Sequence, residues 1–512
     1  MSNEEKALKT TGFMSFIERY GNKIPDPFVF FLILIGLCLF GSWFMSIFGI
    51  NDVNPATGKV VNVYNLLSRD GIVKMVASVV SNFTTFTVMC MTLTCMLGMC
   101  VADQSGFFES VMKNIILKSK GSDNKIIFVF CLISALADIT NGAGFVIMPL
   151  LGSVVWSNMG RNPIAGMLCG YGTVAGAFCA NFMLGTTDVV CAGFTQTAAR
   201  VINASYVSSA SMCWYFQSIA AVILTFTSFF ITIKYVEPRL GVLEDNSVKH
   251  KENSEIADEG KALKYAFFAL LIYLVVILIT TIPSDGWLRE AKTGNLVSGK
   301  SPFMQSLVFL IALFFFIPGF VFGKITGSIP DIKSLIKVFN SGIASMSGFI
   351  VLSFIMAQFM QYFSWSNIGT IIAIKGAKIL TASGLPFIGI CVIFIIFCAI
   401  LNLFMGSASA KYGLLAPVFV PMFMLMGYDP SVPQMCYRIG DAITNPITPT
   451  FAYIAMLMAQ VKKYDPKMGF GSLMTGLMPY TISFSLVLII QFVIWVIIGI
   501  PFGPGGSIVL IK

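Results

Sequence analysis

The most informative part of this chain is MGSASAKYGLLAPVFVPMFMLMGYDP, at positions 405–430. It belongs to an apolar segment, about 385–427, which is too long for one membrane span of ~20 residues and is interrupted by small polar residues. Irregular backbone at membrane depth is costly unless its peptide groups face protein, ions or water. We therefore interpret this segment as a re-entrant helical hairpin with its tip near Ser409.

The span after this hairpin is predicted to break in the middle. Its sequence YRIGDAITNPITPT, at 437–450, contains Pro446 and Pro449, and neither residue has a backbone N–H to donate. An earlier part of the chain repeats this order of features, with ADITNGAGFVIMPLLGSVVWSNMGRNP at 137–163 and GYGTVAGAFCANFMLGTTD at 170–188. A second hairpin, at about 125–160, and a second broken span are therefore expected in the first half.

The two halves agree in spacing as well as in order. In each half a small polar tip precedes a proline by eight residues, a Gly-x-x-Pro turn closes the hairpin, and the next span carries Gly-x4-Asn. The tips with their prolines are Asn141 with Pro149 and Ser409 with Pro417, and the asparagines of the spans are Asn181 and Asn445. The hairpins are predicted to enter from opposite faces, and such an inverted-topology repeat is typical of secondary transporters.

Composition places the whole chain in a membrane. Of 512 residues, 56% are hydrophobic and 11% are charged, against roughly a quarter charged in soluble domains. We predict an all-α integral membrane protein with nine transmembrane helices plus two re-entrant helical hairpins. The predicted spans are 27–50, 73–101, 163–198, 212–234, 264–284, 303–323, 338–364, 431–460 and 471–500.

Basic residues predict the orientation and the divisions of the chain. With the N-terminus inside, the inside segments hold 21 Lys and Arg and the outside segments hold 10, as expected for a multi-pass protein of the bacterial inner membrane with a cytoplasmic N-terminus. The expected divisions are a cytoplasmic segment 1–26, a first half 27–236, a cytoplasmic linker 237–263 and a second half 264–512. Amphipathic stretches at about 103–120 and 366–382 are expected to lie along the interface before each hairpin.

Ionisable residues inside the membrane are costly and usually functional. The candidates are Asp138, Asp188, Lys411, Arg438 and Asp441. Arg438 and Asp441 are three residues apart on one helical face, so they can form a structural ion pair. Alternatively, Arg438 binds a substrate carboxylate and Asp441 couples to an ion or a proton. In each hairpin the second arm begins at the tip, and the free N–H groups and positive dipole end of its helix favour binding of an anion there. The full set of predicted substrate-binding residues is Asn141, Gly142, Asn181, Asp188, Ser409, Tyr412, Arg438, Asp441, Asn445 and Pro449.

A subset of these residues could hold a coupling ion. Asn141, Asp188, Ser409 and Asn445 supply the oxygens of a candidate Na⁺ site, although the amides could instead satisfy neighbouring backbone. The coupling ion is expected to be Na⁺ or H⁺, and no cofactor is expected. The only histidine is His250, in a hydrophilic loop, and the twelve cysteines have no metal-ligand spacing. A zinc site or a histidine-based catalytic residue in the membrane is therefore not expected.

Two motifs of the second half, GSASAKYGLLAPVFVPMFMLMG at 406–427 and YRIGDAITNPITP at 437–449, closely resemble those of the AbgT family of p-aminobenzoyl-glutamate transporters. ERYGNKIPDP at 18–27, GRNPIAG at 160–166, ANFMLGTTD at 180–188, GLPFIG at 384–389 and PFGPG at 501–505 look like landmarks of the same family. The resemblance covers nearly the whole chain and implies a homodimer with nine spans plus two hairpins in each protomer. It also implies ion-driven transport of p-aminobenzoyl-glutamate, or efflux of sulfonamide-like antimetabolites.

Carried onto this chain, the functional positions of the family are Asp188, Ser409, Tyr412, Arg438, Asp441 and Pro449. Members of the family usually have Trp where this chain has Tyr412, so substrate preference is expected to shift while ring stacking survives. The main hypothesis is an ion-coupled importer of a small aromatic or dicarboxylate anion across the bilayer. Drug efflux and a dicarboxylate carrier are alternatives, a channel is disfavoured because no ring of like charge is visible, and no enzyme motif or nucleic-acid partner is predicted.

Overall fold

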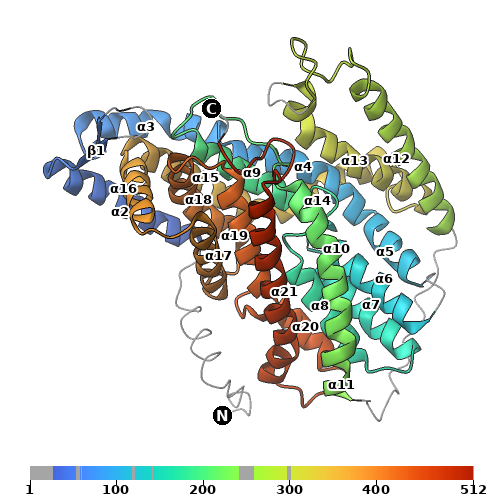
Figure 1. The fold of residues 1–512 in the computed structure, drawn as a ribbon. Helices are drawn as coiled ribbons and strands as arrows, with labels where there is room; N and C mark the ends of the chain where they lie inside the picture. The colour runs from blue at the N-terminus through green and yellow to red at the C-terminus, as the bar shows by residue number, and fades with distance from the viewer. Residues whose placement is uncertain are drawn as a thin grey trace, which may run out of the picture.

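The structure is a computed structural model, and it describes residues 27–53, 58, 60–117, 122–140, 142–241, 259–296, 301–451 and 453–510. Helices form nearly all of its regular structure (Figure 1). The elements of the first half are α2 (Pro27–Ile47), β1 (Asn51–Val53), β2 (Val60–Asn62), α3 (Arg69–Thr84), α4 (Thr87–Gln104), α5 (Phe107–Leu117), α6 (Asp123–Leu136), η2 (Ala137–Thr140), α7 (Gly144–Asn158), α8 (Pro163–Gly176), α9 (Thr186–Ala199), α10 (Trp214–Ile231), η3 (Thr232–Val236) and α11 (Glu237–Leu240).

The second half follows the linker, most of which lies outside the described residues, as does the predicted segment 1–26. Its elements are α12 (Glu259–Thr281), α13 (Pro302–Thr326), α14 (Ile332–Ser345), α15 (Ser347–Trp365), α16 (Ile368–Ala382), α17 (Phe387–Phe404), α18 (Ala408–Leu425), α19 (Ser431–Thr444), η4 (Asn445–Ile447), α20 (Ile454–Val461) and α21 (Phe470–Ile498).

The predicted fold class is confirmed. Within the described ranges, nine helical segments are long and apolar enough to cross a membrane. They include the two arms of the second hairpin, α17 and α18, and they leave out the two interrupted spans, α8–α9 and α19–α20. If α17 and α18 are counted as a hairpin, and α8–α9 and α19–α20 are counted as one interrupted span each, the described helices make nine spans plus two hairpins. This arrangement fits the predicted re-entrant hairpins.

One predicted span is divided in the structure. The segment 73–101 falls on two helices, because α3 ends at Thr84 and α4 begins at Thr87. The hydroxyl of Thr85 donates to the carbonyl of Ser81 at 2.7 Å, and that of Thr84 donates to Val80 at 3.1 Å. Hydroxyls that bond backward to carbonyls compete with the helical ladder and bend helices. The clustered threonines thus mark the point where the helix is interrupted.

Both hairpin tips pack against the break in the second half, between η4 and α20. In the first hairpin, a Cβ added at Gly142 would collide with the hydroxyl of Tyr453, and the ring of Phe145 stacks on that of Tyr453 with centroids 4.6 Å apart. In the second hairpin, a Cβ at Gly406 would collide with the carbonyl oxygen of Thr450. The two tips therefore converge on one stretch of irregular backbone, as the inverted repeat predicts.

A short β-hairpin lies outside the helical bundle. Strands β1 and β2 are antiparallel, with Asp52 opposite Val61. Asp52 forms an ion pair with Lys378 of α16, which anchors the β-hairpin to this helix. The hydrogen bond from Lys378 lowers the pKa of the Asp52 carboxyl from its ordinary value. The stretch 366–382, predicted to lie along the interface, is thus largely a helix, α16, that is tied to the β-hairpin.

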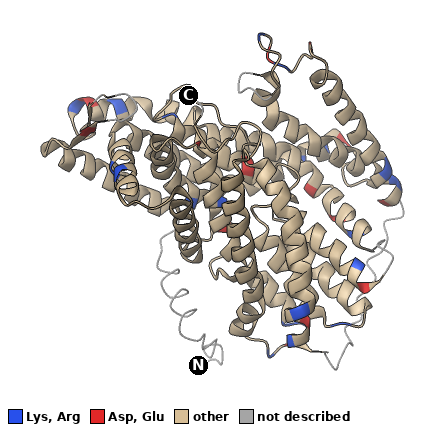
Figure 2. Cartoon of the chain, viewed as in Figure 1, with Lys and Arg blue, Asp and Glu red and all other residues tan. Residues whose placement is uncertain are grey.

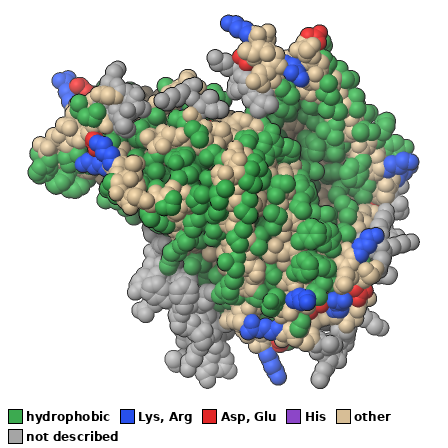
Figure 3. Space-filling view, viewed as in Figure 1, with side chains coloured by type: hydrophobic (Ala, Val, Ile, Leu, Met, Phe, Trp, Pro, Cys, Tyr) green, Lys and Arg blue, Asp and Glu red, His purple; other side chains and the backbone are tan. Residues whose placement is uncertain are grey.

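The surface has the pattern of a membrane protein. Lys, Arg, Asp and Glu gather toward the two ends of the long helices, and few lie between them (Figure 2). Hydrophobic side chains cover the middle of the face in Figure 3. Large apolar side chains are exposed on single-span helices such as α2 and α12, where Leu37 is 60% and Phe268 is 60% exposed. Lipid is the solvent that such side chains require.

Small residues let α4 and α13 approach closely. A Cβ added at Gly98 of α4 would overlap the backbone of Ala312, and one at Gly319 of α13 would overlap the backbone of Ala102. Because lipid tails are as apolar as the helices, association in a membrane depends on such close packing rather than on the hydrophobic effect. This pair of helices is therefore specified by two glycines.

We expect the substitution Gly98→Ala to destabilise the protein by about 1–3 kcal/mol, because the added methyl group overpacks a backbone contact. The measurement is the midpoint of thermal unfolding of the purified protein in detergent. Gly36→Ala in α2 is the matched control, since a Cβ there has no atom within 4 Å. Equal midpoints for the two variants would show that the close contact of α4 and α13 contributes nothing to stability.

Candidate transport site

Arg438 joins the two halves of the chain through Asp188. Asp188 lies in the first turn of α9, where its carboxylate accepts a hydrogen bond from the backbone N–H of Gly185 at 2.8 Å and one from the amide of Gln217 at 2.9 Å. The guanidinium of Arg438, on α19, forms an ion pair with this carboxylate and donates to the carbonyl of Phe178 at 2.8 Å. Both charged side chains are at most 5% exposed.

A second buried ion pair lies next to the first along α19. Lys411, on α18, pairs with Asp441, and the two side chains are 1% and 3% exposed. The ammonium of Lys411 also donates to the amide oxygen of Asn402, in the first arm of the same hairpin. The amide nitrogen of Asn402 in turn donates to the backbone carbonyl of Asp441 at 2.7 Å and to Oδ1 of Asn445 at 2.8 Å.

The pairing of Arg438 with Asp441 that their spacing allows does not form in the structure. Although the two residues are three apart on one helix, each one finds its partner on another element, Asp188 of α9 and Lys411 of α18. The reason is that α19 is buried along its whole length between these elements, so each charge is met by an opposite charge across a helix interface. An intrahelical pair would have left Asp188 and Lys411 buried without a counter-ion, which is costly.

A third carboxylate, Asp138, lies at the tip of the first hairpin. It is partly buried in η2, and it interacts electrostatically with Arg438, Asp188 and Asp441. Among the described residues it forms no ion pair with a base. The centre of the protein therefore brings together three carboxylates and two cationic side chains.

Tyr412, whose ring stacking is expected to survive in place of the family's Trp, packs against protein in the structure. Its side chain is buried and stacks on the ring of Tyr437, with centroids 4.4 Å apart and planes at 24°. Its hydroxyl lies 2.6 Å from the hydroxyl of Thr195, which donates to Gln434 at 2.6 Å. In this conformation Tyr412 ties the second hairpin to α9 and α19.

The remaining predicted residues fall on the tips and breaks. Asn181 is buried in the first break, where its side chain accepts a hydrogen bond from the backbone N–H of Met183 at 3.2 Å. Ser409 is half-buried at the second tip, 3.4 Å from the hydroxyl of Ser407. Gly142 has φ +97°, a left-handed conformation that favours glycine. Pro449 lies in the second break, and Asn141 lies outside the described residues.

Sequence reasoning missed Asn402, together with the hydroxyls of Thr444 and Thr448 that contact it. The amide nitrogen of Asn402 lies 2.9 Å from the hydroxyl of Thr444 and 3.5 Å from that of Thr448. One signal was available, because Asn402 is a lone amide near the end of an apolar run, and a buried polar group in such a run needs partners. The candidate Na⁺ ligand Asn445 accepts a hydrogen bond from Asn402 with its side-chain oxygen, while its buried amide nitrogen has no hydrogen-bond partner among the described residues.

The ion pair between Asp188 and Arg438 should show strong coupling in a double-mutant cycle. We expect Asp188→Asn or Arg438→Gln alone to destabilise the protein by about 3–5 kcal/mol, because each leaves a buried charge unpaired, whereas the double variant should lose much less than the sum. Thermal unfolding of the four proteins measures this coupling. Asp123→Asn, which removes a partly exposed partner of Arg161, is the control and should cost less than about 1 kcal/mol. Additive losses at 188 and 438 would show that the pair is not coupled.

Comparison with known proteins agrees with this architecture. The model of the AbgT putative transporter family matches residues 12–510. The p-aminobenzoyl-glutamate transport protein of Escherichia coli (strain K12) is 32% identical over 505 residues, which is 99% of this chain and 98% of that protein.

Among solved structures, the YdaH transporter of Alcanivorax borkumensis has a TM-score of 0.86 and 31% identity, covering 94% of this chain and 100% of that one. MtrF of Neisseria gonorrhoeae, described in its structure report as illuminating a class of antimetabolite efflux pumps, has a TM-score of 0.90 and 34% identity, covering 97% and 100%. The chain belongs to the AbgT family of transporters.

Proposed function

We propose that this membrane transporter is a secondary active carrier of p-aminobenzoyl-glutamate or a similar small aromatic anion, driven by a Na⁺ or proton gradient. The observation that carries the proposal is the pair of buried ion pairs on α19, Asp188–Arg438 and Lys411–Asp441. They lie where broken spans and hairpin tips converge, and intramembrane charges in such places mark solute and ion pathways.

Arg438 is the proposed ligand of a substrate carboxylate. Its two terminal nitrogens donate to Asp188 and to the carbonyl of Phe178. Its Nε is buried and has no hydrogen-bond partner among the described residues, so this donor is available to a substrate. A guanidinium binds carboxylates with two parallel hydrogen bonds, and the substrate would take over the place that Asp188 holds. The N-terminus of α18, capped by the hydroxyl of Ser407, would add a favourable dipole.

The coupling ion would balance the carboxylate that the substrate displaces. When a substrate engages Arg438, Asp188 loses its counter-ion, and a bound proton or Na⁺ would restore neutrality. Asp138 already lacks a basic partner in the described part of the chain. Ser409 and Asn445, with Asn141, remain the proposed neutral oxygen donors for Na⁺. Substrate and cation would then bind together, which is the basis of coupling.

Orientation and assembly are part of this proposal. We place the N-terminus and the linker 237–263 on the cytoplasmic side of the inner membrane, because the Lys and Arg excess lies in the segments on that side. We also propose a homodimer, which the resemblance to the family implies. Within each protomer the two inverted halves would then rock about the shared central site.

Uptake into proteoliposomes tests the main proposal. We expect saturable uptake of p-aminobenzoyl-glutamate that collapses when the Na⁺ gradient or the proton gradient is dissipated, with each gradient varied separately. Arg438→Gln should reduce uptake at least tenfold, since a single charge-assisted bidentate contact is worth more than about 1.4 kcal/mol. Arg239→Gln, at an exposed position in α11, should transport normally. Uptake that is indifferent to both gradients would contradict secondary active transport.

A second candidate is efflux of sulfonamide-type antimetabolites, which is favoured by the 34% identity to MtrF, described with a class of antimetabolite efflux pumps. Expression of the wild-type chain in a sulfonamide-sensitive host should then raise the minimal inhibitory concentration several-fold. The Arg438→Gln variant, produced at the same level, should leave that concentration at the value of the empty host. Equal tolerance with and without the wild-type chain would eliminate efflux of these compounds.

A further inference from the structure

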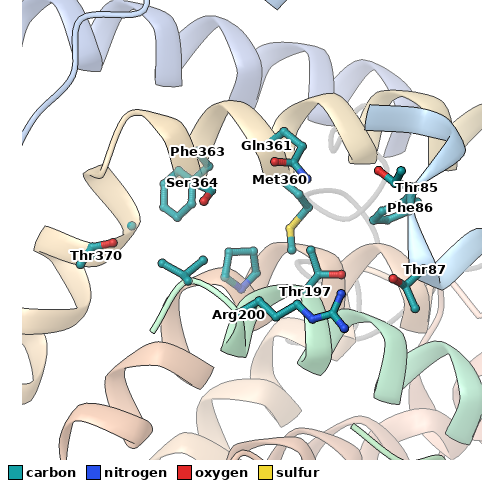
Figure 4. Close-up of a pocket in the computed structure, with 14 residues that line it drawn as sticks. Thr85, Phe86, Thr87, Thr197, Arg200, Met360, Gln361, Phe363, Ser364 and Thr370 are labelled. Atoms are coloured by element: carbon teal, nitrogen blue, oxygen red, sulfur yellow. The ribbon is translucent and has the colours of Figure 1, made fainter. Parts of the chain in front are cut away.

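A cavity of about 230 Å³ lies at the far end of α9 from the central ion pairs. It is lined by the break between α3 and α4, the last turn of α9, the end of α15, the first turn of α16 and Pro417 of α18 (Figure 4). Arg200 at this end of α9 is twelve residues from Asp188, so the two sites are roughly 18 Å apart along the helix. None of the five central charged residues lines this cavity.

Arg200 is the charged group of the cavity. Its Nε donates to the carbonyl of Tyr206 at 3.1 Å, and its side chain is otherwise exposed. It forms no ion pair with any acid in the part of the chain that the structure describes. In Figure 4 the guanidinium extends from α9 beneath Thr197 and toward Thr87. One wall of the cavity is therefore positively charged without an internal counter-ion.

The start of α4 adds a second attraction for an anion at the same end. Thr87 is the first residue of this 18-residue helix, and the residue before it, Phe86, makes no side-chain capping hydrogen bond. The first N–H groups of a helix have no intrahelical acceptor, and the helix dipole places partial positive charge there. The interruption of α3 and α4 by threonines thus creates a helix N-terminus beside Arg200.

The opposite end of the cavity carries a polar group that lacks a partner. Thr370, in the first turn of α16, is 6% exposed, and its hydroxyl makes no hydrogen bond with another described residue. Phe363 and Met360 of α15 lie between Thr370 and the Arg200 end in Figure 4, and they form an apolar middle. Because Thr370 lines the cavity, its hydroxyl can bond a ligand or solvent there. The cavity is therefore polar at both ends and apolar between them.

We propose that this cavity is a docking site for a small aromatic carboxylate that carries a hydrogen-bonding group at its other end. The carboxylate lies between Arg200 and the N-terminus of α4, the ring contacts Phe363 and Met360, and the distal amine or amide reaches Thr370. At about 230 Å³ the cavity is below the roughly 300–1,000 Å³ of a drug-sized site, so it holds one ring with its substituents rather than a large drug. Binding at this cavity does not rest on the proposed function of the central site.

Photolabelling tests the binding directly. The probe is 4-azidobenzoate, an aromatic carboxylate that reacts with neighbouring residues on irradiation, applied to the purified full-length protein in lipid nanodiscs. Mass spectrometry of the digested protein should find the label on the segments 360–364 or 85–87. Excess p-aminobenzoate should abolish this labelling. Labelling confined to the surroundings of Arg438, or spread evenly over the chain, would overturn the proposal.

Charge variants separate this site from the central one. Arg200→Gln should lower labelling of 360–364 at least fivefold, whereas Arg200→Lys should retain part of it. Lys375→Gln, which removes an equal charge on α16 outside the cavity, should label as the wild type. The double variant Asp188→Asn/Arg438→Gln, which disables the central site without leaving a buried charge unpaired, should keep the label on 360–364 as well. Equal loss in Arg200→Gln and Lys375→Gln would show a surface-charge effect and contradict the site. Labelling that survives while p-aminobenzoyl-glutamate uptake fails in the wild type would uphold this site and reject only the proposed function.

Discussion

A buried charge must have a counter-charge, and this constraint organises the centre of the molecule. Arg438 is enclosed by protein at a depth where an isolated guanidinium would be very costly. Its partner Asp188 belongs to the other half of the chain, so the two halves cannot separate without exposing both charges to a poor solvent. The same helix, α19, presents Asp441 to Lys411 of the second hairpin. One buried helix therefore fixes the position of the first broken span and of a hairpin at once.

The irregular backbone is tolerated because it is surrounded by protein. The second break, around Pro449, meets one hairpin tip through Tyr453 and the other through the carbonyl of Thr450. Both contacts need glycine on the hairpin side, at 142 and at 406, because any Cβ there would occupy the space of the break. Small tips thus have a packing role as well as the binding role proposed above. Sterics at the tips and electrostatics on α19 place the same elements together.

The sequence predicts the architecture well because it is written in long, strong signals. Apolar runs, interrupted runs and the echo between the halves are all one-dimensional patterns, and the fold class that they predict is confirmed. The site is only partly predictable, for a reason that Arg438 and Asp441 illustrate. Their spacing allows a pair on one face, but the crossing of α9 and α18 over α19 decides the actual partners, and no local pattern encodes that crossing.

Residues that looked unremarkable in the sequence were missed for related reasons. Asn402 is one amide in an apolar arm, and only the folded hairpin shows that it bridges Lys411 and Asn445. Arg200 lies just beyond the predicted span 163–198. Basic residues are common at the ends of spans, so its position alone does not indicate a binding role. Its cavity is lined by residues of 85–87, 197–201 and 360–370 and by Pro417, which are far apart in the sequence. Sites made at the meeting of several helices require the three-dimensional arrangement.

The charge balance of the centre has a consequence for transport. Asp138, Asp188 and Asp441 face Lys411 and Arg438, so with all five groups ionised the centre carries one net negative charge. An anionic substrate could not enter such a site alone, because its charge would add to the net negative charge of the centre in a medium of low dielectric constant. In the carrier proposed above, entry of a carboxylate would need a proton or a metal cation to enter with it, and its departure would release that cation. Coupling would then follow from electroneutrality at the centre, whichever cation the protein uses and whichever direction the gradient drives.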